Sequence, residues 1–347
     1  MQNTRSNGAH RGACAVLLAG ALAALLSVTG GDALAKKPPK PPPDGGGLAN
    51  PALTFVAGSK VFVMTADGAH SATLVGGGKY YRKDPTWLPD GSRVAFRLNG
   101  EIYTVNPDGT GLTTSQLLDR ECSYLIEDRI VLYRKAGDLW VADLDSGATQ
   151  ALGVLGTLPA WEKADTPAAT ADLDPATPGY QGWIAYVNKR WETSIDPTDP
   201  DVHIARLTGI EVGSFAFHAS TVQRLPWPTA QNLPEWSADG TTLAFLSDAG
   251  YVDAGRELLV VDVDLAATPA FGPPRVLFSD APGVNVLFRP AVSPDGSWVA
   301  FTHRVGAAKL DVERVRADGS GELLELASTI NNPQQPHWNP QWTNDLD

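Results

Sequence analysis

The chain has 347 residues and carries 27 lysine and arginine side chains against 39 aspartate and glutamate side chains, for a formal net charge of −12 at pH 7. A surface with this excess of acidic groups repels nucleic acid and anionic lipid, so we expect neither as a partner. The 2 cysteines exclude a scaffold held by several disulfides, so stability must come from an apolar core.

The N-terminal residues follow the order of a secretory signal peptide. Arg5 and Arg11 come first, an apolar run extends from Cys14 to Val28, and Ala33-Leu34-Ala35 forms a cleavage site of small residues. A membrane anchor is the alternative, but the run is short for a hydrocarbon core about 30 Å thick. We expect cleavage after Ala35, export to the periplasm or out of the cell, and no membrane span in the mature chain.

The segment that follows has the composition of a linker. Residues 36–50 begin with KKPPKPPPDGGG. Proline-rich stretches adopt extended polyproline II structure and glycine-rich stretches are flexible, so this segment cannot build a core. The chain therefore divides into a signal peptide over 1–35, a tether over 36–50 and a folded domain over 51–347.

One phrase recurs along the folded domain. WLPDGSRVAF at 87–96 returns as WSADGTTLAF at 236–245 and as VSPDGSWVAF at 292–301, each time with a proline two residues before it. Internal repetition of this kind is typical of repeat architectures. Further copies begin at Pro159, at Pro336 and, with cysteine in place of proline, at Cys122.

Each apolar triplet of the repeat is followed by a second alternating segment that runs into a turn. In EIYTVNPDG, which begins at Glu101, apolar and polar residues alternate up to an Asp-Gly pair. Alternation with period two predicts a strand, and Asp-Gly predicts a tight turn. Segments such as LTTSQLL at 112–118 supply a fourth strand. Four antiparallel strands in roughly 40–45 residues make one blade of a β-propeller.

The two ends of the domain each hold part of a blade. The copy at 336–338 has room for a first strand only, whereas residues 52–75 hold later strands without a first. Together they make one blade, so we predict an all-β fold: a six-bladed β-propeller of four-stranded antiparallel blades, closed by pairing of the C-terminal strand with the N-terminal strands. The other blades are expected at 80–117, 118–156, 157–226, 230–278 and 286–328.

The pattern W-[SL]-x-DG-x-x-[LV]-A-F, followed by an Asp-Gly strand, resembles the TolB-type propeller repeat, a WD40-like repeat, over roughly residues 52–347. The resemblance implies a six-bladed ring with a water-filled axial channel, found largely in bacterial envelopes and secretions. TolB itself binds partner proteins, whereas a similar propeller, oligogalacturonate lyase, is an enzyme. The G-x-S-x-G motif of serine hydrolases does not occur in this sequence.

Two sets of residues are candidates for binding. Long segments at 188–201 and 217–232 should share one face of the ring, and long loops on a rigid scaffold often bind ligands. The alternative is that their aromatic side chains only cap the edge of the ring. This platform would consist of Arg190, Trp191, His218, Arg224 and Trp227.

The second set precedes the first strand of each blade, where it should stand at one mouth of the channel. These positions could hold a cation or a charged peptide end, or could simply be solvated. The polar ones are Asp84, Glu121, Arg289 and Gln335.

No residue pattern predicts catalysis, a metal site or a cofactor. The histidines lack metal-ligand spacing, and a cation in the channel is possible but is not predicted. We therefore predict an exported, monomeric, non-catalytic propeller that binds a protein or peptide partner at one face of the ring.

Two alternatives remain open. A lyase- or hydrolase-like enzyme acting on a saccharide or peptide at the channel mouth should bring histidine and acidic side chains into hydrogen-bond reach there, with shifted pKa values. A sugar-binding ring should have a shallow groove floored by Trp191 or Trp227.

Overall fold

The structure is a computed structural model, and no helix in the part it describes is long and apolar enough to cross a membrane. The predicted signal peptide and nearly all of the predicted tether lie outside the described residues. The described residues are 48, 50–78, 82–88, 90–99, 101–118, 121–125, 130–135, 138–143, 146–153, 168–169, 180–188, 201–210, 216–227, 230–237, 239–248, 256–265, 269–279, 287–305, 309–327, 330 and 332–342.

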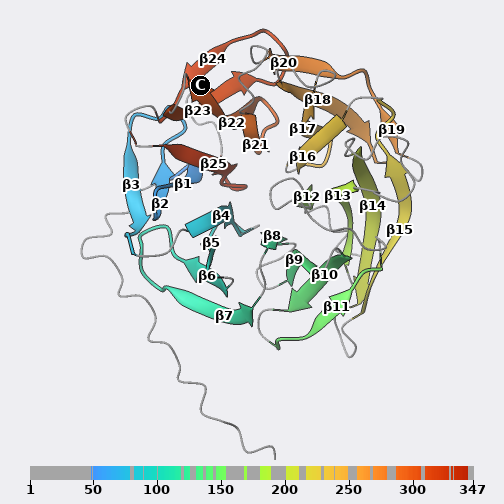
Figure 1. Cartoon of the computed structure of the whole chain (residues 1–347), viewed down its shortest axis with the longest axis horizontal. Helices are drawn as coiled ribbons and strands as arrows, with labels where there is room; N and C mark the ends of the chain where they lie inside the picture. The colour runs from blue at the N-terminus through green and yellow to red at the C-terminus, as the bar shows by residue number, and fades with distance from the viewer. Residues whose placement is uncertain are drawn as a thin grey trace, which may run out of the picture. The chain divides into compact units, whose positions relative to one another are not determined.

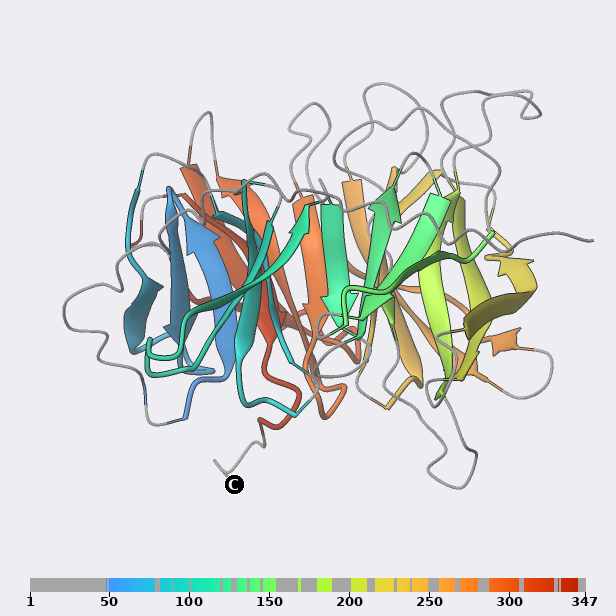
Figure 2. The same ribbon diagram turned by 90° about the horizontal axis from the view of Figure 1, so that it is seen from below.

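Every regular element in these ranges is a β-strand, and the strands form six antiparallel sheets arranged as the blades of a propeller (Figure 1). Figure 2 shows the strands running between the two faces of the ring. Blade one is β4–β7 (Arg82–Trp87, Val94–Leu98, Glu101–Val105, Thr113–Leu118), and blade two is β8–β11 (Glu121–Leu125, Ile130–Lys135, Asp138–Asp143, Thr149–Ala151).

The remaining blades follow in chain order around the ring. Blade three is β12–β15 (Ala168–Ala169, Tyr180–Asn188, Asp201–Ile210, Ala216–Arg224). Blade four is β16–β20 (Ala230–Trp236, Thr242–Asp248, Arg256–Asp264, Ala270–Phe271, Arg275–Ser279), and blade five is β21–β24 (Leu287–Val292, Trp298–Val305, Lys309–Arg316, Leu323–Glu325).

Blade six joins the two ends of the domain. Its order is β25 (Pro333–Trp338), β1 (Leu53–Ala57), β2 (Lys60–Met64) and β3 (Ser71–Val75). The predicted pairing of the last strand with the first is therefore present, and Leu53 lies opposite Trp338 in its register.

Blades three and four depart in detail from the predicted unit. The sequence placed the first strand of blade three at 159–161, which lies outside the described residues, whereas the described partner of β13 is β12. In blade four both β19 and β20 pair with β18, which makes five strands instead of four. The sequence Gly272-Pro273-Pro274 separates these two outer strands, and proline cannot donate to a ladder.

Apolar side chains from neighbouring blades form the core between them. Trp236 of blade four, 5% exposed, packs with Trp183 and Val187 of blade three, and Trp87 of blade one packs with Val61 of blade six. A blade has two apolar faces and cannot bury both alone, so the ring is what removes them from water.

The Asp-Gly turns follow one design. In the turn after β16, Asp239 accepts hydrogen bonds from the Ser237 hydroxyl at 2.6 Å and from the Thr241 amide at 3.0 Å, while Gly240 has a φ of +70°. The same pattern surrounds Asp295. These hydrogen bonds outweigh the effect of burial and lower the pKa of both carboxyl groups. These hydrogen bonds and the positive φ of the glycine explain why Asp-Gly recurs in the turns.

Candidate binding site at the ring axis

The first strands of the blades carry a repeated β-bulge. In blade one Lys83 pairs with Arg97 and Thr86 with Ala95, so Asp84 and Pro85 together oppose Phe96. Proline suits the extra position because a bulged residue need not donate to the ladder. The same two-to-one arrangement sets 233–234 against Phe245, 289–290 against Phe301 and 335–336 against Phe55.

The residue before each of these prolines has an unusual backbone. Its φ is +53° at Asp84, +52° at Leu233, +38° at Arg289 and +57° at Gln335. Residues other than glycine rarely adopt such φ values, and this backbone conformation costs of order 1–3 kcal/mol. The bulge therefore gives these four side chains a direction that regular strand alternation would not give them.

Three of these side chains meet. The Asp84 carboxylate lies 2.7 Å from Nη2 of Arg289 and 2.9 Å from Nη2 of Arg97. Gln335 donates from Nε2 to Asp84 Oδ1 at 3.2 Å and accepts from the Asp84 backbone amide at 2.9 Å. The backbone N–H of Gln335 donates to the buried hydroxyl of Thr302 at 3.0 Å. We call Asp84, Arg97, Arg289 and Gln335 the axial cluster.

The axial cluster joins blades one, five and six at the centre of the ring. Its members lie on β4, β5, β21 and β25, and Figure 1 shows β4, β21 and β25 among the innermost strands. The Asp84 side chain is 6% exposed, whereas those of Arg97 and Arg289 are 17% and 19% exposed. The carboxylate thus lies deeper than the two guanidinium groups that it positions.

A second polar group lies beside the axial cluster. His337 Nδ1 lies 2.9 Å from the Trp338 carbonyl oxygen, and its Nε2 lies 3.0 Å from Thr86 Oγ1. A carbonyl can only accept, so the shorter contact assigns the proton to Nδ1 and lets the Thr86 hydroxyl donate to Nε2. The Trp87 backbone N–H also lies 3.4 Å from Nδ1, a longer contact that this tautomer leaves without a hydrogen bond. Glu235 Oε1 of blade four lies 3.7 Å from the same Nε2, beyond hydrogen-bond distance.

Its surroundings keep His337 neutral near pH 7. Burial lowers the pKa of its imidazole to about 4, with the positive charge of Arg289 acting in the same direction. The hydrogen bond to the Trp338 carbonyl opposes this shift. An imidazole with this pKa is a weak base, because general bases work best with a pKa near the operating pH.

Thr86, His337 and Glu235 are the residue types of a catalytic triad, but they do not have its geometry. In a triad the carboxylate orients the histidine through the ring nitrogen that does not face the nucleophile. Here the hydroxyl and the carboxylate both lie on the Nε2 side, and a backbone carbonyl faces Nδ1. Thr86 is 4% exposed, which leaves its hydroxyl little access to a substrate.

The structure brings together three of the four residues predicted for the channel mouth. Asp84, Arg289 and Gln335 are in contact, while the side chain of Glu121 lies outside the described residues.

The residues predicted for the loop platform are not brought together in the described part of the chain. Arg190 and Trp191 lie outside the described residues. Of the rest, His218 is exposed on β15, Arg224 forms an exposed ion pair with Asp201 at 2.8 Å, and Trp227 stacks on Phe245. No described contact joins these three into one platform.

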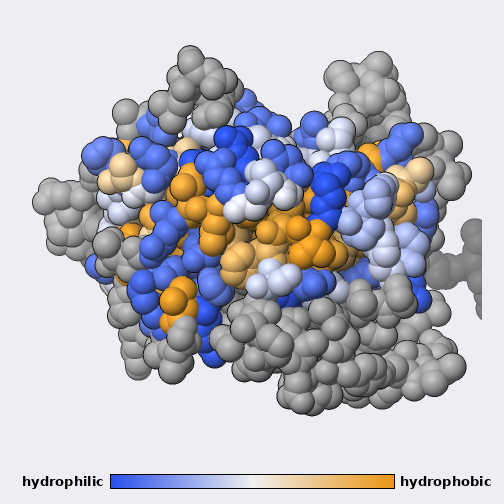
Figure 3. Space-filling view, turned by 90° about the horizontal axis from the view of Figure 1, so that it is seen from above, coloured by the Kyte–Doolittle hydropathy of each residue, from blue (hydrophilic) through white to orange (hydrophobic). Residues whose placement is uncertain are grey.

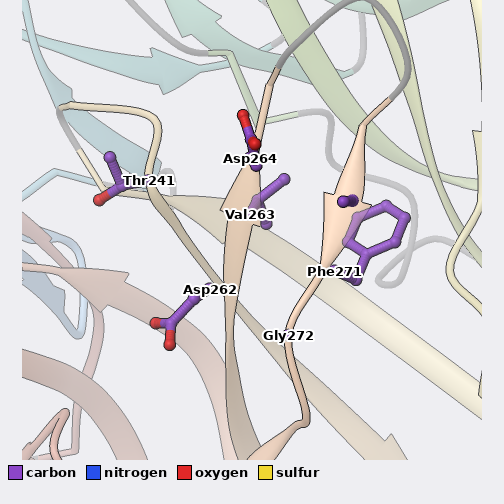
Figure 4. Close-up of a pocket in the computed structure, with 7 residues that line it drawn as sticks. Thr241, Asp262, Val263, Asp264, Phe271 and Gly272 are labelled. Atoms are coloured by element: carbon purple, nitrogen blue, oxygen red, sulfur yellow. The ribbon is translucent and has the colours of Figure 1, made fainter.

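Trp227 instead supports a shallow pocket at the outside of blade four. Its ring meets the edge of Phe271 at 6.1 Å between centroids. Phe271 lines a pocket of about 440 Å³ together with Thr241, Asp262, Val263 and Asp264. Figure 4 shows Phe271 on β19 beside β18, which carries the two aspartates. We call this the lateral pocket.

Sequence reasoning missed Arg97, Thr86 and Glu235. Arg97 directly follows the phenylalanine that opposes the bulge, and Thr86 and Glu235 both stand between the repeat proline and its tryptophan. Their positions in the repeat were thus visible, and the position of Glu235 corresponds to Thr86 in blade one. Without the bulge, however, the direction of their side chains could not be inferred.

Solved structures show the same fold. TolB from Acinetobacter baumannii superposes with a TM-score of 0.59 at 16% identity, over 86% of this chain and 68% of that one. A putative TolB from Agrobacterium tumefaciens gives 0.52 at 14%, over 82% and 93%. A chain of a nidogen/laminin complex gives 0.53 at 13%, over 84% and 99%. No family model and no curated relative matches the sequence. The fold is thus that of TolB-like six-bladed propellers.

Proposed function

We propose that this chain is an exported, non-catalytic, TolB-like propeller that binds a protein or peptide partner at one face of the ring. The observation that carries the proposal is the axial cluster, in which Arg97 and Arg289 are partly exposed around a buried Asp84. Its members come from three blades, and three of them, Asp84, Arg289 and Gln335, have a strained backbone with positive φ.

The chemistry of the cluster suits a polar group of a partner. A guanidinium group has five N–H donors in a planar fork that matches a carboxylate. Asp84 fixes one edge of each fork and so reduces the side-chain entropy that binding would cost. A carboxylate or a run of backbone carbonyls from the partner would meet the remaining donors of Arg97.

Two further observations support the proposal. One of the solved structures with this fold is itself a complex between two proteins, nidogen and laminin. The N-terminal order of basic, apolar and small residues supports export, where a partner in the cell envelope or outside the cell would be met.

The proposal is tested by comparing partner recovery and affinity between the wild type and Arg97→Ala. Envelope and secreted extracts are passed over the immobilised protein, and a recovered partner is then purified and titrated. Because the substitution removes a charged donor, we expect affinity to fall at least about tenfold.

Two matched variants complete this experiment. Arg206→Ala removes an exposed arginine from β14 and should leave affinity unchanged, whereas Arg224→Ala tests the loop platform separately. Equal affinity of wild type and Arg97→Ala for every recovered partner would refute binding at the axial cluster.

An enzyme is the second candidate, because the Thr86 hydroxyl contacts the His337 imidazole at 3.0 Å and the Glu235 carboxylate lies 3.7 Å from the same ring. The geometry and the lowered pKa of His337 argue against it. The two functions are separated by assaying ester, peptide and acidic oligosaccharide substrates with the wild type and with His337→Gln. Turnover that disappears in the variant would favour the enzyme.

A further inference from the structure

Two cations lie directly opposite each other on the inner strands of blade one. Lys83 on β4 is the register partner of Arg97 on β5, so both side chains project from the same side of the sheet. Lys83 is exposed, and the side chain of Arg97 is 17% exposed. Like charges placed directly opposite each other destabilise a sheet, so this arrangement stabilises the fold less than a neutral pair would. We call Lys83 and Arg97 the cation pair.

One carboxylate serves the cations at this place. Asp84 lies 2.9 Å from Arg97, but it also lies 2.7 Å from Arg289, so its negative charge is shared. Lys83 forms no ion pair with any residue that the structure describes. Arg82, the residue before it, is 4% exposed and donates to a backbone carbonyl of blade six. The cation pair therefore has more positive charge than its described ion pairs neutralise.

The other described carboxylates of this region are placed elsewhere. Glu101 on β6 projects from the opposite side of the sheet, because its register partner on β5 is the residue after Arg97. Asp138 of blade two lies on β10, the third strand from the axis in that blade. Glu235 of blade four lies on the Nε2 side of His337. No described contact joins any of these three carboxylates to the cation pair.

The hydrogen-bond donors of the cation pair suit one carboxylate. Arg97 contacts Asp84 through Nη2, and a guanidinium group has five N–H donors in a planar fork. The ammonium group of Lys83 adds three donors from the opposite strand. A carboxylate between the two side chains would accept from both and would remove their mutual repulsion. On a chain with a net charge of −12, such a place is the exception, since most of the surface repels acidic groups.

We propose that the cation pair binds a carboxylate of the partner, supplied by an aspartate or glutamate side chain or by the C-terminus of a peptide segment. The carboxylate accepts hydrogen bonds from Lys83 Nζ and from the donors of Arg97 that do not face Asp84. The inference rests on the proposed function and names the chemical group that the partner presents to the axial cluster. An acidic saccharide suits the site less well, because its hydroxyl groups also need acceptors and the cation pair offers donors.

Apolar surface elsewhere on the ring offers a competing way to capture a peptide. Figure 3 shows an apolar area in the middle of one side of the molecule. Among the described residues, Val276 and Val305 are large hydrophobic side chains with 47% and 43% exposure. Peptides captured by apolar contacts would not require a carboxylate, Lys83 or Arg97. The experiment therefore measures how binding depends on each of these three.

The experiment selects binders for the purified protein from a phage library that displays random short peptides with free C-termini. The selected peptides are made synthetically and titrated by fluorescence anisotropy. Each peptide is also made with glutamine or asparagine in place of its acidic residues, and with an amidated C-terminus. We expect one of these changes to weaken binding at least about tenfold, and which change does so identifies the source of the carboxylate.

Lys83→Met tests the second cation, because it removes the charge and keeps most of the stem. It should weaken binding of the acidic peptide at least about fivefold and that of the neutralised peptide less than about twofold. Lys60→Ala is the control, since it removes an exposed lysine from β2 without a described contact to the axial cluster. Without peptide, Lys83→Met should raise the thermal midpoint, because it removes a like charge opposite Arg97.

The outcomes separate this inference from the proposed function. Peptides that require Arg97 but neither a carboxylate nor Lys83 would overturn the inference and leave the proposed function standing. Peptides that bind the wild type and Arg97→Ala equally, or a library without any enriched peptide, would count against both. A lowered thermal midpoint for Lys83→Met would assign that lysine to stability and overturn the inference. A polyuronate that displaces every selected peptide and binds more tightly would assign the cation pair to a saccharide and overturn it as well.

Discussion

Trp338, in the last strand of the chain, lies opposite Leu53, in the first, and both side chains are almost completely buried. Trp338 also contacts Trp342 at 5.0 Å between ring centroids and belongs to a core cluster that includes Trp298 of blade five. The pairing of the two ends of the domain is therefore coupled to the packing between blades five and six.

This coupling predicts that Trp338→Ala is strongly destabilising. Truncating a buried aromatic side chain costs about 3–5 kcal/mol, and here the loss also weakens the sheet that joins the ends. The free energy of unfolding, measured by denaturant titration, should fall by that amount. Val276→Ala is the control, because its side chain is 47% exposed and should change stability little. A loss below about 1 kcal/mol for Trp338→Ala would contradict the packing.

Asp84→Asn should destabilise the fold through the two arginines that the carboxylate holds. The substitution keeps the shape of the side chain but leaves Arg97 and Arg289 without their shared buried anion. Removing one partner of a buried ion pair typically costs about 3–5 kcal/mol. The exposed pair of Asp201 and Arg224 provides the control, and Asp201→Asn should cost less than about 1 kcal/mol. Equal losses in the two variants would show that Asp84 is not holding the cluster.

The repeat in the sequence was sufficient to predict the blades because every blade uses the same strands and turns to bury two apolar faces against its neighbours. A Pro-x-Trp strand, an Asp-Gly turn and a triplet ending in phenylalanine recur, and the structure gives them equivalent roles in blades one and four. The joined blade followed from the incomplete copies at Pro336 and at 52–75. Blade three was harder, since its first strand lies at Ala168–Ala169 in a stretch with no recognisable copy of the repeat.

The axial cluster could be predicted only in part. Asp84, Arg289 and Gln335 were found because they share a position before the repeat proline, so repetition alone brought them to one place. Arg97 lies on the second strand, and its contact with Asp84 depends on the bulge that reorients the carboxylate. The residue before a proline normally prefers extended backbone with negative φ, so sequence propensities do not predict a positive φ at this position.

Two glycines in the Asp-Gly turns share one backbone conformation, but we predict that alanine at these two positions destabilises the fold to different extents. Gly91 and Gly296 have φ values of +67° and +68° and occupy equivalent turns. A Cβ at Gly91 would lie 2.5 Å from Asn339 Oδ1 and 2.8 Å from Gln341 Cγ, whereas a Cβ at Gly296 would meet nothing within 4 Å. Gly296→Ala should therefore cost about 1 kcal/mol for the backbone alone, and Gly91→Ala should cost more. Equal thermal midpoints for the two variants would contradict the close approach at Gly91.

The lowered pKa of His337 predicts how the free energy of unfolding changes in mild acid. Its folded pKa is about 4, below the unfolded value of 6.5, so the unfolded chain binds more protons between these two pH values. Stability should be fully present above pH 6.5 and fall as pH decreases toward 4, by about 2 kcal/mol at pH 5 and about 3 kcal/mol at the end of this window. Because carboxylates also titrate in acid, the contribution of His337 is isolated by subtracting the pH profile of His337→Gln. Superimposable denaturation profiles for the two proteins between pH 7 and pH 5 would show that His337 is not held neutral by its surroundings.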